Sequence, residues 1–228
     1  MTGSKFHLKN RLKKALGRTA SSVHWLQRQI NDPYVIKAKE MGLRGRAYFK
    51  LEQLDSQFHL FKKGTRVVDL GCAPGGWVQY AVKKTGSSEK NPLVVGLDIL
   101  PIEPVAGAVL IQQDFTEPEA VELLQQALQG HKVNIVVSDM APNTTGIPSV
   151  DHLRIMNLLE LAWDFARQVL LPGGAFVGKI FEGGTESTFL AELKRNFKTV
   201  KHVKPHASRK ESVEFYVVAK DFKCTTTK

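Results

Sequence analysis

The chain has 228 residues and a mass of 25.4 kDa, and 43% of its residues are hydrophobic, 24% charged and 8% aromatic. This composition is typical of globular proteins, and it excludes a fibrous chain and a largely disordered one. A chain of this length suits one α/β domain with an extension, or a tight pair of domains. It can bury roughly 70% of the surface that its unfolded form exposes, so it needs no metal or disulfide to fold.

The sequence also excludes a membrane-spanning protein, a disulfide-stabilised fold and a zinc protein. The longest stretch without a charged residue is 70–82, which is too short to cross a bilayer. Two cysteines, Cys72 and Cys224, are too few for a disulfide framework or a closed zinc site, which points to a reducing compartment. The seven histidines show no metal-ligand spacing, so we expect no bound metal.

The net charge of +10 is located at the N-terminus. Residues 1–50 hold twelve Lys/Arg and two acids, whereas the rest of the chain holds twenty of each. A second basic run lies between Glu192 and Glu211. A neutral body with two basic stretches suits a polyanion partner, because each neutralised phosphate releases counterions, although a solvated charged face with a disordered tail fits the charge equally well.

Residues 1–20 are predicted to form a flexible basic arm. They lack the apolar segment and cleavage motif of a secretory signal. They are basic, free of acids and contain Ser and Thr, so a mitochondrial presequence stays open as the minority interpretation.

The hydrophobic pattern predicts helices first and a βα alternation afterwards. Helical spacing runs from 21 to 60, with a break at Asp32-Pro33, since proline is tolerated in the first turn of a new helix. The predicted strands are 66–70, 93–97, 109–112, 133–138, 175–180 and two final ones near 200–203 and 215–219. The predicted helices among them run from the glycine-rich loop to about 84, over 118–128, from about 151 to 170 and over 187–197. Repeated βα units imply a mainly parallel sheet with helices on both faces, and one of the last two strands is expected to be antiparallel.

A glycine-rich loop, Asp69-Leu70-Gly71-Cys72-Ala73-Pro74-Gly75-Gly76-Trp77, follows the first strand and opens a helix. Its glycines let the backbone approach a ligand beyond the carboxyl ends of the strands. A phosphate-binding P-loop is excluded because Gly-Lys-Ser/Thr is missing, and Ala73 replaces the third glycine of the dinucleotide fingerprint. The acid that leads the loop, Asp69, would repel a pyrophosphate, so a ligand with a cationic part is favoured over a turn without a ligand.

Two further acids stand at strand ends. Asp98 follows the second strand, where an acid can accept both hydroxyls of a ribose, and Asp114 follows the third, near the place of an adenine edge. Each alone is more often a helix cap or a surface acid. Together with Asp69 they describe an adenosine-bearing, positively charged ligand, and S-adenosylmethionine fits.

Four motifs in order then resemble the FtsJ-type ribosomal RNA ribose 2′-O-methyltransferases. They are 69–77, Ser138-Asp139-Met140-Ala141-Pro142-Asn143, Phe176-Val177-Gly178-Lys179 and Arg46-Ala47-Tyr48-Phe49-Lys50-Leu51. The resemblance runs from about Ser21 to Ala219, with Pro205-His206-Ala207-Ser208-Arg209 near its end. It implies a Rossmann-like S-adenosylmethionine-dependent methyltransferase fold with a seven-stranded, mostly parallel sheet. It also implies one methyltransferase domain at 21–223, with N-terminal helices at 21–60 and the catalytic sheet at 65–220.

The resemblance also assigns site residues. A catalytic tetrad carries over to Lys50, Asp139, Lys179 and Glu214. Contacts with S-adenosylmethionine carry over to Gly75, Trp77, Asp98, Asp114 and Asp139. The implied partner is large-subunit rRNA or a pre-ribosomal 50S particle, bound by a cytoplasmic monomer. A mitochondrial matrix location is the alternative.

The proposed chemistry constrains the lysines. A ribose 2′-hydroxyl reacts only when a base removes or polarises its proton, and a lysine serves as base only if its pKa falls well below about 10. Lys179 ends the apolar strand 175–178, which favours desolvation, and Lys50 adds like-charge repulsion. Asp139 opposes both effects, so its expected role is to orient Lys179 and the methyl donor, while Glu214 is expected to tether Lys50 or the ribose.

Other functions remain open at this point. The same chemistry can act on tRNA or on a messenger cap, because acceptor choice depends on the shape of the basic surface. An RNA-binding ribosome-assembly factor would use the same basic residues without chemistry, although the lysine pair, the donor acids and the glycine loop argue against it. A nicotinamide enzyme is disfavoured by Ala73.

Overall fold

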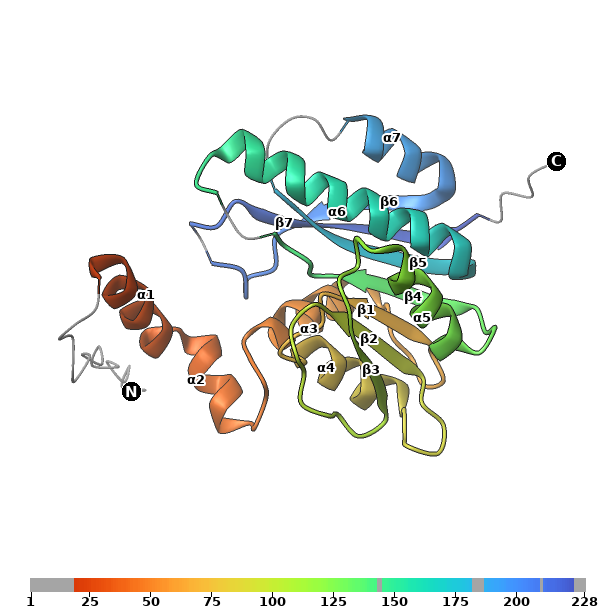
Figure 1. The fold of residues 1–228 in the computed structure, drawn as a ribbon, viewed down its shortest axis with the longest axis horizontal. Helices are drawn as coiled ribbons and strands as arrows, with labels where there is room; N and C mark the ends of the chain where they lie inside the picture. Colours follow the sequence, from red (N-terminus) through yellow and green to blue (C-terminus); the bar gives the residue numbers. More distant parts are fainter. Residues whose placement is uncertain (1–18, 143–144, 182–186, 210, 224–228) are drawn as a thin grey trace, which may run out of the picture.

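The computed structural model describes residues 19–142, 145–181, 187–209 and 211–223 (Figure 1). Nearly all of the predicted basic arm therefore lies outside the described residues. The elements follow in the order α1 (Ala20–Asn31), α2 (Pro33–Glu40), α3 (Ala47–Phe58), β1 (Val67–Leu70), α4 (Gly76–Thr85), β2 (Val94–Asp98), β3 (Ala108–Gln112), α5 (Pro118–Leu128), β4 (Val133–Ser138), α6 (Pro148–Val169), β5 (Leu170–Phe181), α7 (Ser187–Asn196), β6 (Phe197–Val203) and β7 (Glu214–Phe222).

The strands form one seven-stranded sheet in the order β3-β2-β1-β4-β5-β7-β6. Strands β1 to β5 pair in parallel, and β7 pairs antiparallel with both β5 and β6. The predicted mostly parallel sheet with one antiparallel strand is thus confirmed, and that strand is β7. The order reverses at β1, so the loops after β1 and β4 open at the switch point, where ligands of such sheets bind.

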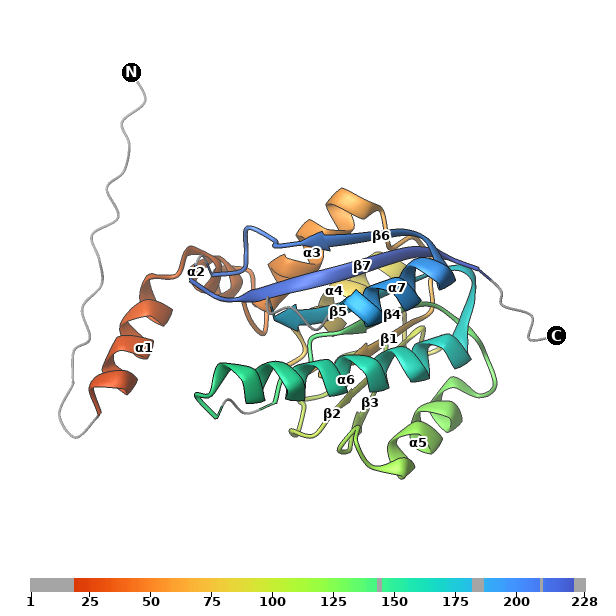
Figure 2. The same cartoon turned by 90° about the horizontal axis from the view of Figure 1, so that it is seen from above.

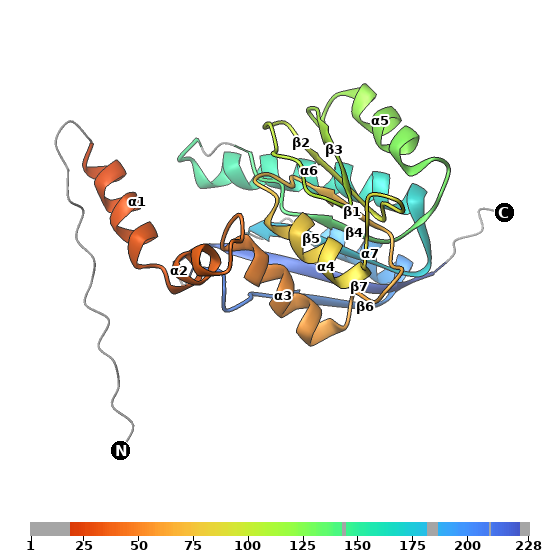
Figure 3. The ribbon, with the colours of Figure 1, turned by 90° about the horizontal axis from the view of Figure 1, so that it is seen from below.

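Helices cover both faces of the sheet. Figure 3 shows α3 and α4 over one face, and in Figure 2 α5 and α6 lie on the other side of the strands. Each face of the sheet has its own apolar core, because successive side chains of a strand point to opposite faces. Val68 and Leu70 of β1 pack in the core that α5, α6 and α7 cover, whereas Val67 packs in the core that α3 and α4 cover. By the same alternation Asp69, two residues after Val67, lies on the α3 and α4 face of the sheet. Asp139, two residues after Val137 of β4, is expected on this face too.

Several predicted boundaries are wrong. Strand β6 begins at Phe197 rather than near residue 200, and residues 41–46 separate α2 from α3 within the run that was predicted as helical. Helix α6 begins at Pro148 rather than near residue 151, since a proline fits the first helical position. Strand β5 begins at Leu170, where it pairs with Val133, and its register then shifts before Ala175 pairs with Ile135. The turn expected at 171–174 is therefore an irregularity inside the strand rather than a break before it.

The first two helices meet at Asp32, which begins α2. Its Oδ1 accepts hydrogen bonds from the backbone amides of Tyr34 (3.0 Å) and Val35 (3.4 Å). Its Oδ2 lies 2.9 Å from Nη1 of Arg46, just before α3. One carboxylate thus caps a helix and attaches the N-terminal helices to the body, which confirms the predicted break at Asp32-Pro33.

Candidate active site

A cavity of about 660 Å³, which we call the donor cavity, opens at the carboxyl ends of β1 to β4. Its walls come from the loops after these strands, with one residue each of α6 and β5. Three predicted acids line it, Asp98, Asp114 and Asp139, and so does Lys179. A cavity of this volume can hold a nucleoside-sized ligand.

Asp98 ties the glycine-rich loop to the end of β2. Its Oδ2 accepts a hydrogen bond from the amide of Ala73 (2.8 Å), and its Oδ1 accepts one from the amide of Leu100 (2.9 Å). A carboxylate has about four lone-pair sites, so both oxygens keep capacity for ligand hydroxyls. The loop itself packs against the segment after β4 at Gly71, whose φ is +76°, and where an added Cβ would lie 2.7 Å from the amide nitrogen of Met140.

Asp114 lines the donor cavity after β3. Its Oδ1 accepts hydrogen bonds from the amide (2.9 Å) and the hydroxyl (2.7 Å) of Thr116. These two bonds hold the pKa of Asp114 below its ordinary value. The group is therefore a carboxylate at neutral pH, an acceptor for amino or hydroxyl groups of a ligand.

Asp69 is buried beneath this cavity, with 1% of its surface exposed. Within the described residues, neither of its carboxyl oxygens has a hydrogen-bond partner. Burial, together with the negative charges of Asp139 and Asp98, raises its pKa well above the ordinary value. A cationic group placed beside these three acids would offset their mutual repulsion, so this end of the cavity fits a positively charged ligand.

Gly75 and Trp77 lie outside the lining of the donor cavity. Gly75 caps α4 with a φ of 109°, and its neighbour is the side chain of Arg44. The buried indole of Trp77 donates a hydrogen bond to the carbonyl of Ala47 (2.7 Å), and its ring lies 5.6 Å from that of Tyr216. Trp77 thus contacts α3 and β7, and the assignment of both residues to donor binding stays a prediction.

The four residues of the predicted tetrad come together as two ion pairs. Lys50 Nζ, from α3, lies 2.5 Å from Oε1 of Glu214 on β7. Lys179 Nζ, from β5, lies 2.7 Å from Oδ1 of Asp139 and donates to its backbone carbonyl at 2.8 Å. Both lysines are less than a tenth exposed.

Tyr216, which the sequence reasoning missed, joins the two ion pairs. Its hydroxyl donates to Oδ1 of Asp139 (2.5 Å) and accepts from Nζ of Lys50 (3.1 Å). It lies directly opposite Lys179 in the β5–β7 register, and it shares a strand face with Glu214 two residues earlier. That period of two from Glu214 is a sequence signal that could have identified it. Burial and the charges of Asp139 and Glu214 raise its pKa well above 10, so the phenol keeps its proton.

Asp139 is the charged centre of this network. Burial alone would oppose its ionisation, but attraction to Lys179 and Lys50 and the hydrogen bonds from Lys179 and Tyr216 hold its pKa below the ordinary value. The buried Asp69 and the partly buried Asp139 thus have opposite pKa shifts, because Asp139 has cationic and hydrogen-bonding partners and Asp69 has none among the described residues. Ser208 adds a further hydrogen bond, from its hydroxyl to Oε1 of Glu214 (3.1 Å), that the sequence reasoning also missed.

Two absences hold within the part of the chain that the structure describes. No three His, Cys, Asp or Glu side chains there gather in a way that could hold a metal ion. No helix there has the length and apolar character needed to span a bilayer.

Comparison with known proteins gives concordant matches. A family model described as FtsJ-like methyltransferase matches residues 43–222. The protein named Ribosomal RNA large subunit methyltransferase E from Azorhizobium caulinodans is 54% identical over 216 residues, which cover 95% of this chain and 90% of that protein. The protein of the same name from Novosphingobium aromaticivorans is 56% identical over 213 residues, covering 93% and 94%. A crystal structure from Plasmodium falciparum described as that of a ribosomal RNA methyltransferase aligns with a TM-score of 0.68 at 28% identity, covering 78% of this chain and 98% of that one.

Proposed function

The chain belongs to the FtsJ-like methyltransferase family, and we propose that it transfers a methyl group from S-adenosylmethionine to the 2′-oxygen of a ribose in large-subunit rRNA. The two relatives described above carry large-subunit rRNA methylation in their names. The target ribose is proposed to be that of a uridine.

The observation that carries this proposal is that Tyr216 joins two ion pairs, one at the donor cavity and one at a second cleft. Asp139 and Lys179 line that cavity, whereas Lys50 and Glu214 line a separate cleft. Tyr216 bonds to a residue on each side. A methyl donor in the cavity and a ribose entering from the cleft would therefore approach the same group of charged residues.

The residues around the donor cavity fit S-adenosylmethionine. Asp98 has acceptor capacity for the ribose hydroxyls, and Asp114 for the amino group of the adenine. The unpaired carboxyl of Asp69 and the carboxylate of Asp139 favour the cationic part of the donor. Gly75 and Trp77 are proposed to contribute by shaping the glycine-rich loop and the start of α4. When bound, the donor supplies an electrophilic methyl group on a sulfonium.

The tetrad residues receive distinct roles in this proposal. Lys179 accepts the proton of the 2′-hydroxyl, or orients and polarises it, as the oxygen–methyl bond forms and the methyl–sulfur bond breaks, which leaves S-adenosylhomocysteine as the product. Asp139 orients Lys179 through its carboxylate and its carbonyl. Glu214 fixes Lys50 at the ribose side, and Tyr216 couples the two pairs as a neutral donor.

Partners and location follow from the same assignment. We propose large-subunit rRNA, free or within a pre-ribosomal 50S particle, as the substrate of a monomeric, single-domain enzyme at 21–223. Bacterial relatives support a cytoplasmic site of action over a mitochondrial one. The presequence alternative concerns residues that are outside the described part of the chain.

The direct test supplies the protein with labelled S-adenosylmethionine and separate pools of large-subunit rRNA, small-subunit rRNA, tRNA and capped messenger RNA. Nuclease digestion and mass spectrometry then locate the label. We expect 2′-O-methylribose in large-subunit rRNA. Label on a base, or in tRNA or cap alone, would refute the proposal.

A further inference from the structure

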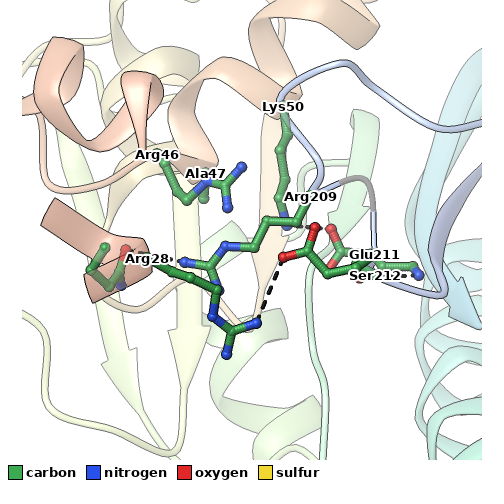
Figure 4. Close-up of a pocket in the computed structure, with 9 residues that line it drawn as sticks. Arg28, Arg46, Ala47, Lys50, Arg209, Glu211 and Ser212 are labelled. Atoms are coloured by element: carbon green, nitrogen blue, oxygen red, sulfur yellow. Dashed lines mark hydrogen bonds and ion pairs between the residues drawn. The ribbon is translucent and has the colours of Figure 1, made fainter. Parts of the chain in front are cut away.

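A second cleft, of about 470 Å³, opens beside the Lys50–Glu214 pair (Figure 4). We call it the arginine cleft, because Arg28, Arg46 and Arg209 line it together with Lys50, Glu211 and Glu214. These residues come from α1, from the start of α3, from the segment before β7 and, for Glu214, from the first position of β7. The two basic stretches of the sequence thus converge here, with Arg28 and Arg46 from the first and Arg209 from the second.

The inner cations of the arginine cleft already have fixed partners. Lys50 is paired with Glu214, and Arg46 is paired with Asp32 and donates from Nη2 to the carbonyl of Ala207. Arg46 is also crowded, because burial and the charge of Arg209 both lower its pKa even though Asp32 opposes them. The inner part of the cleft is therefore rigid and rich in positive charge.

Of the outer cations, Arg28 is paired with the exposed carboxylate of Glu211, and the charge of Arg209 also acts on that carboxylate. Arg209 donates from Nη2 to Oε1 of Gln29 (3.1 Å), and its Nε lies 3.7 Å from Asp32, which Arg46 holds more closely. Arg28 lies 3.6 Å from Glu211, and both of these side chains are more than half exposed. Figure 4 shows the carboxylate of Glu211 turned toward these guanidinium groups. The pKa of Glu211 is below the ordinary value, because its carboxylate accepts a hydrogen bond from its own backbone amide and lies near the charges of Arg28 and Arg209. Glu211 is therefore anionic.

We propose that the arginine cleft binds a backbone phosphate of the RNA strand that carries the target ribose, and that Glu211 holds the place of this phosphate in the free protein. That the bound strand is the RNA to be methylated rests on the proposed function. Its geometric basis is the position of Lys50 and Glu214, which line the cleft and belong to the tetrad. A phosphate bound here lies next to the group that handles the ribose.

Displacement of Glu211 has a low cost. An exposed ion pair such as Arg28–Glu211 contributes little to stability and is screened by salt. A phosphate accepts from two guanidinium groups at once with charge-assisted hydrogen bonds, which are stronger than neutral ones. The cleft volume also suits one nucleotide unit.

The first experiment compares Glu211→Gln with Glu122→Gln, an exposed residue of α5 that gives the same change of net charge. The probes are a short fluorescein-labelled oligouridylate and a transcript of large-subunit rRNA, measured at low and at moderate salt. We expect Glu211→Gln to tighten binding of both about three- to tenfold at low salt, with a smaller gain at moderate salt, and Glu122→Gln to change little. Equal effects of the two variants would overturn the proposal, because the gain would then come from net charge alone.

The second experiment asks whether Glu211 acts through the arginines. Arg28→Ala is expected to weaken RNA binding and to reduce the salt slope by about 0.7, the value for one lost phosphate contact on a single strand. In the Arg28→Ala background, the gain from Glu211→Gln should shrink, since neighbouring residues are not additive. Arg167→Ala, at the far end of α6, is the matched control and should have no effect. Full additivity of the Arg28 and Glu211 changes would contradict the proposal.

These measurements separate the cleft from the enzymatic proposal. If the parent protein methylates large-subunit rRNA but Arg28→Ala and Glu211→Gln leave RNA affinity unchanged, the cleft assignment fails and the proposed function stands. If both variants shift RNA affinity as expected but no ribose is methylated, the cleft assignment stands and the proposed function fails. Calorimetry with S-adenosylmethionine should give parent-like affinity in all these variants, which shows that they are folded.

Discussion

The donor cavity takes its acids from the ends of four consecutive strands, whereas the arginine cleft takes its cations from elements far apart in the chain, with Arg209 standing 181 positions after Arg28. The first is acidic and has an unpaired buried carboxyl, Asp69. The second is basic, and its inner cations are paired. The difference fits the proposal that one side of the tetrad receives a cationic ligand and the other a polyanion, with Tyr216 between them.

The largest expected effect comes from Lys179, where the two sides meet. Lys179→Arg keeps the positive charge but cannot release a proton near neutral pH. If Lys179 is the base, methyl transfer should fall by roughly 10²–10⁴-fold while donor binding persists, and Lys179→Ala should be no better. Single-turnover assays with saturating RNA measure this. A fully active arginine variant with an unchanged pH–rate profile would assign Lys179 to positioning only.

The next largest effect concerns the donor side alone. Asp98→Ala removes a charged acceptor of the ribose hydroxyls, worth on the order of 1.5–3 kcal/mol, or about ten- to a hundredfold in donor affinity. Because Asp98 also accepts from Ala73 and Leu100, Asp98→Asn is the companion variant that retains one oxygen. Calorimetry would exclude this assignment if both variants were folded and bound S-adenosylmethionine like the parent.

Tyr216→Phe tests the connection between the two sides. It removes one buried hydrogen bond from Asp139 and one from Lys50, while their ion pairs with Lys179 and Glu214 remain, and this should cost about 1–3 kcal/mol of stability and slow transfer about tenfold. The pKa of Asp139 is lower in the folded protein than the value of 3.8 for an unperturbed aspartate. Its ionisation therefore stabilises the fold above pH 3.8, and this stabilisation is lost as the pH falls through the folded pKa. Without the phenol this depression is smaller, so acid unfolding should begin at a higher pH. Denaturation curves at several pH values would show it, and identical curves would speak against the role of Tyr216.

The smallest effect is the change in stability per pH unit that we expect from Asp69. Its raised pKa means that the folded state binds a proton more tightly than the unfolded state, so its contribution falls as pH rises above 3.8. Asp69→Asn should therefore gain stability relative to the parent between about pH 4 and 7, by less than about 1.4 kcal/mol per pH unit, and should bind the donor more weakly. A constant stability difference across this range would contradict the raised pKa.

The contrast between the two regions also explains what the sequence could predict. The strands, an antiparallel strand among the last two and the acids of the donor cavity were predicted, because strand-end residues follow from local hydrophobic patterns and parallel sheets bring those ends together. The start of β5 was wrong, since the glycines and proline at 171–174 are compatible with a bulge as well as with a turn. Asp69 and Asp139 looked alike in sequence and differ only through their partners.

The acceptor side was harder to predict. Lys50 and Glu214 pair across 164 residues, and only the family resemblance selected them. Tyr216 looked like an ordinary aromatic residue of a buried strand until the register placed it opposite Lys179. The arginine cleft could not be seen at all, because it depends on how α1 and the segment before β7 pack together.

The central claim, that the site has separate donor and RNA sides, is tested most directly by one paired measurement. Donor affinity by calorimetry and RNA affinity by fluorescence anisotropy are determined side by side for Asp98→Asn and Arg209→Ala, with thermal melting to confirm folding. The account predicts that Asp98→Asn weakens only donor binding and that Arg209→Ala weakens only RNA binding. Two folded variants that each lose both affinities to a similar extent would contradict it.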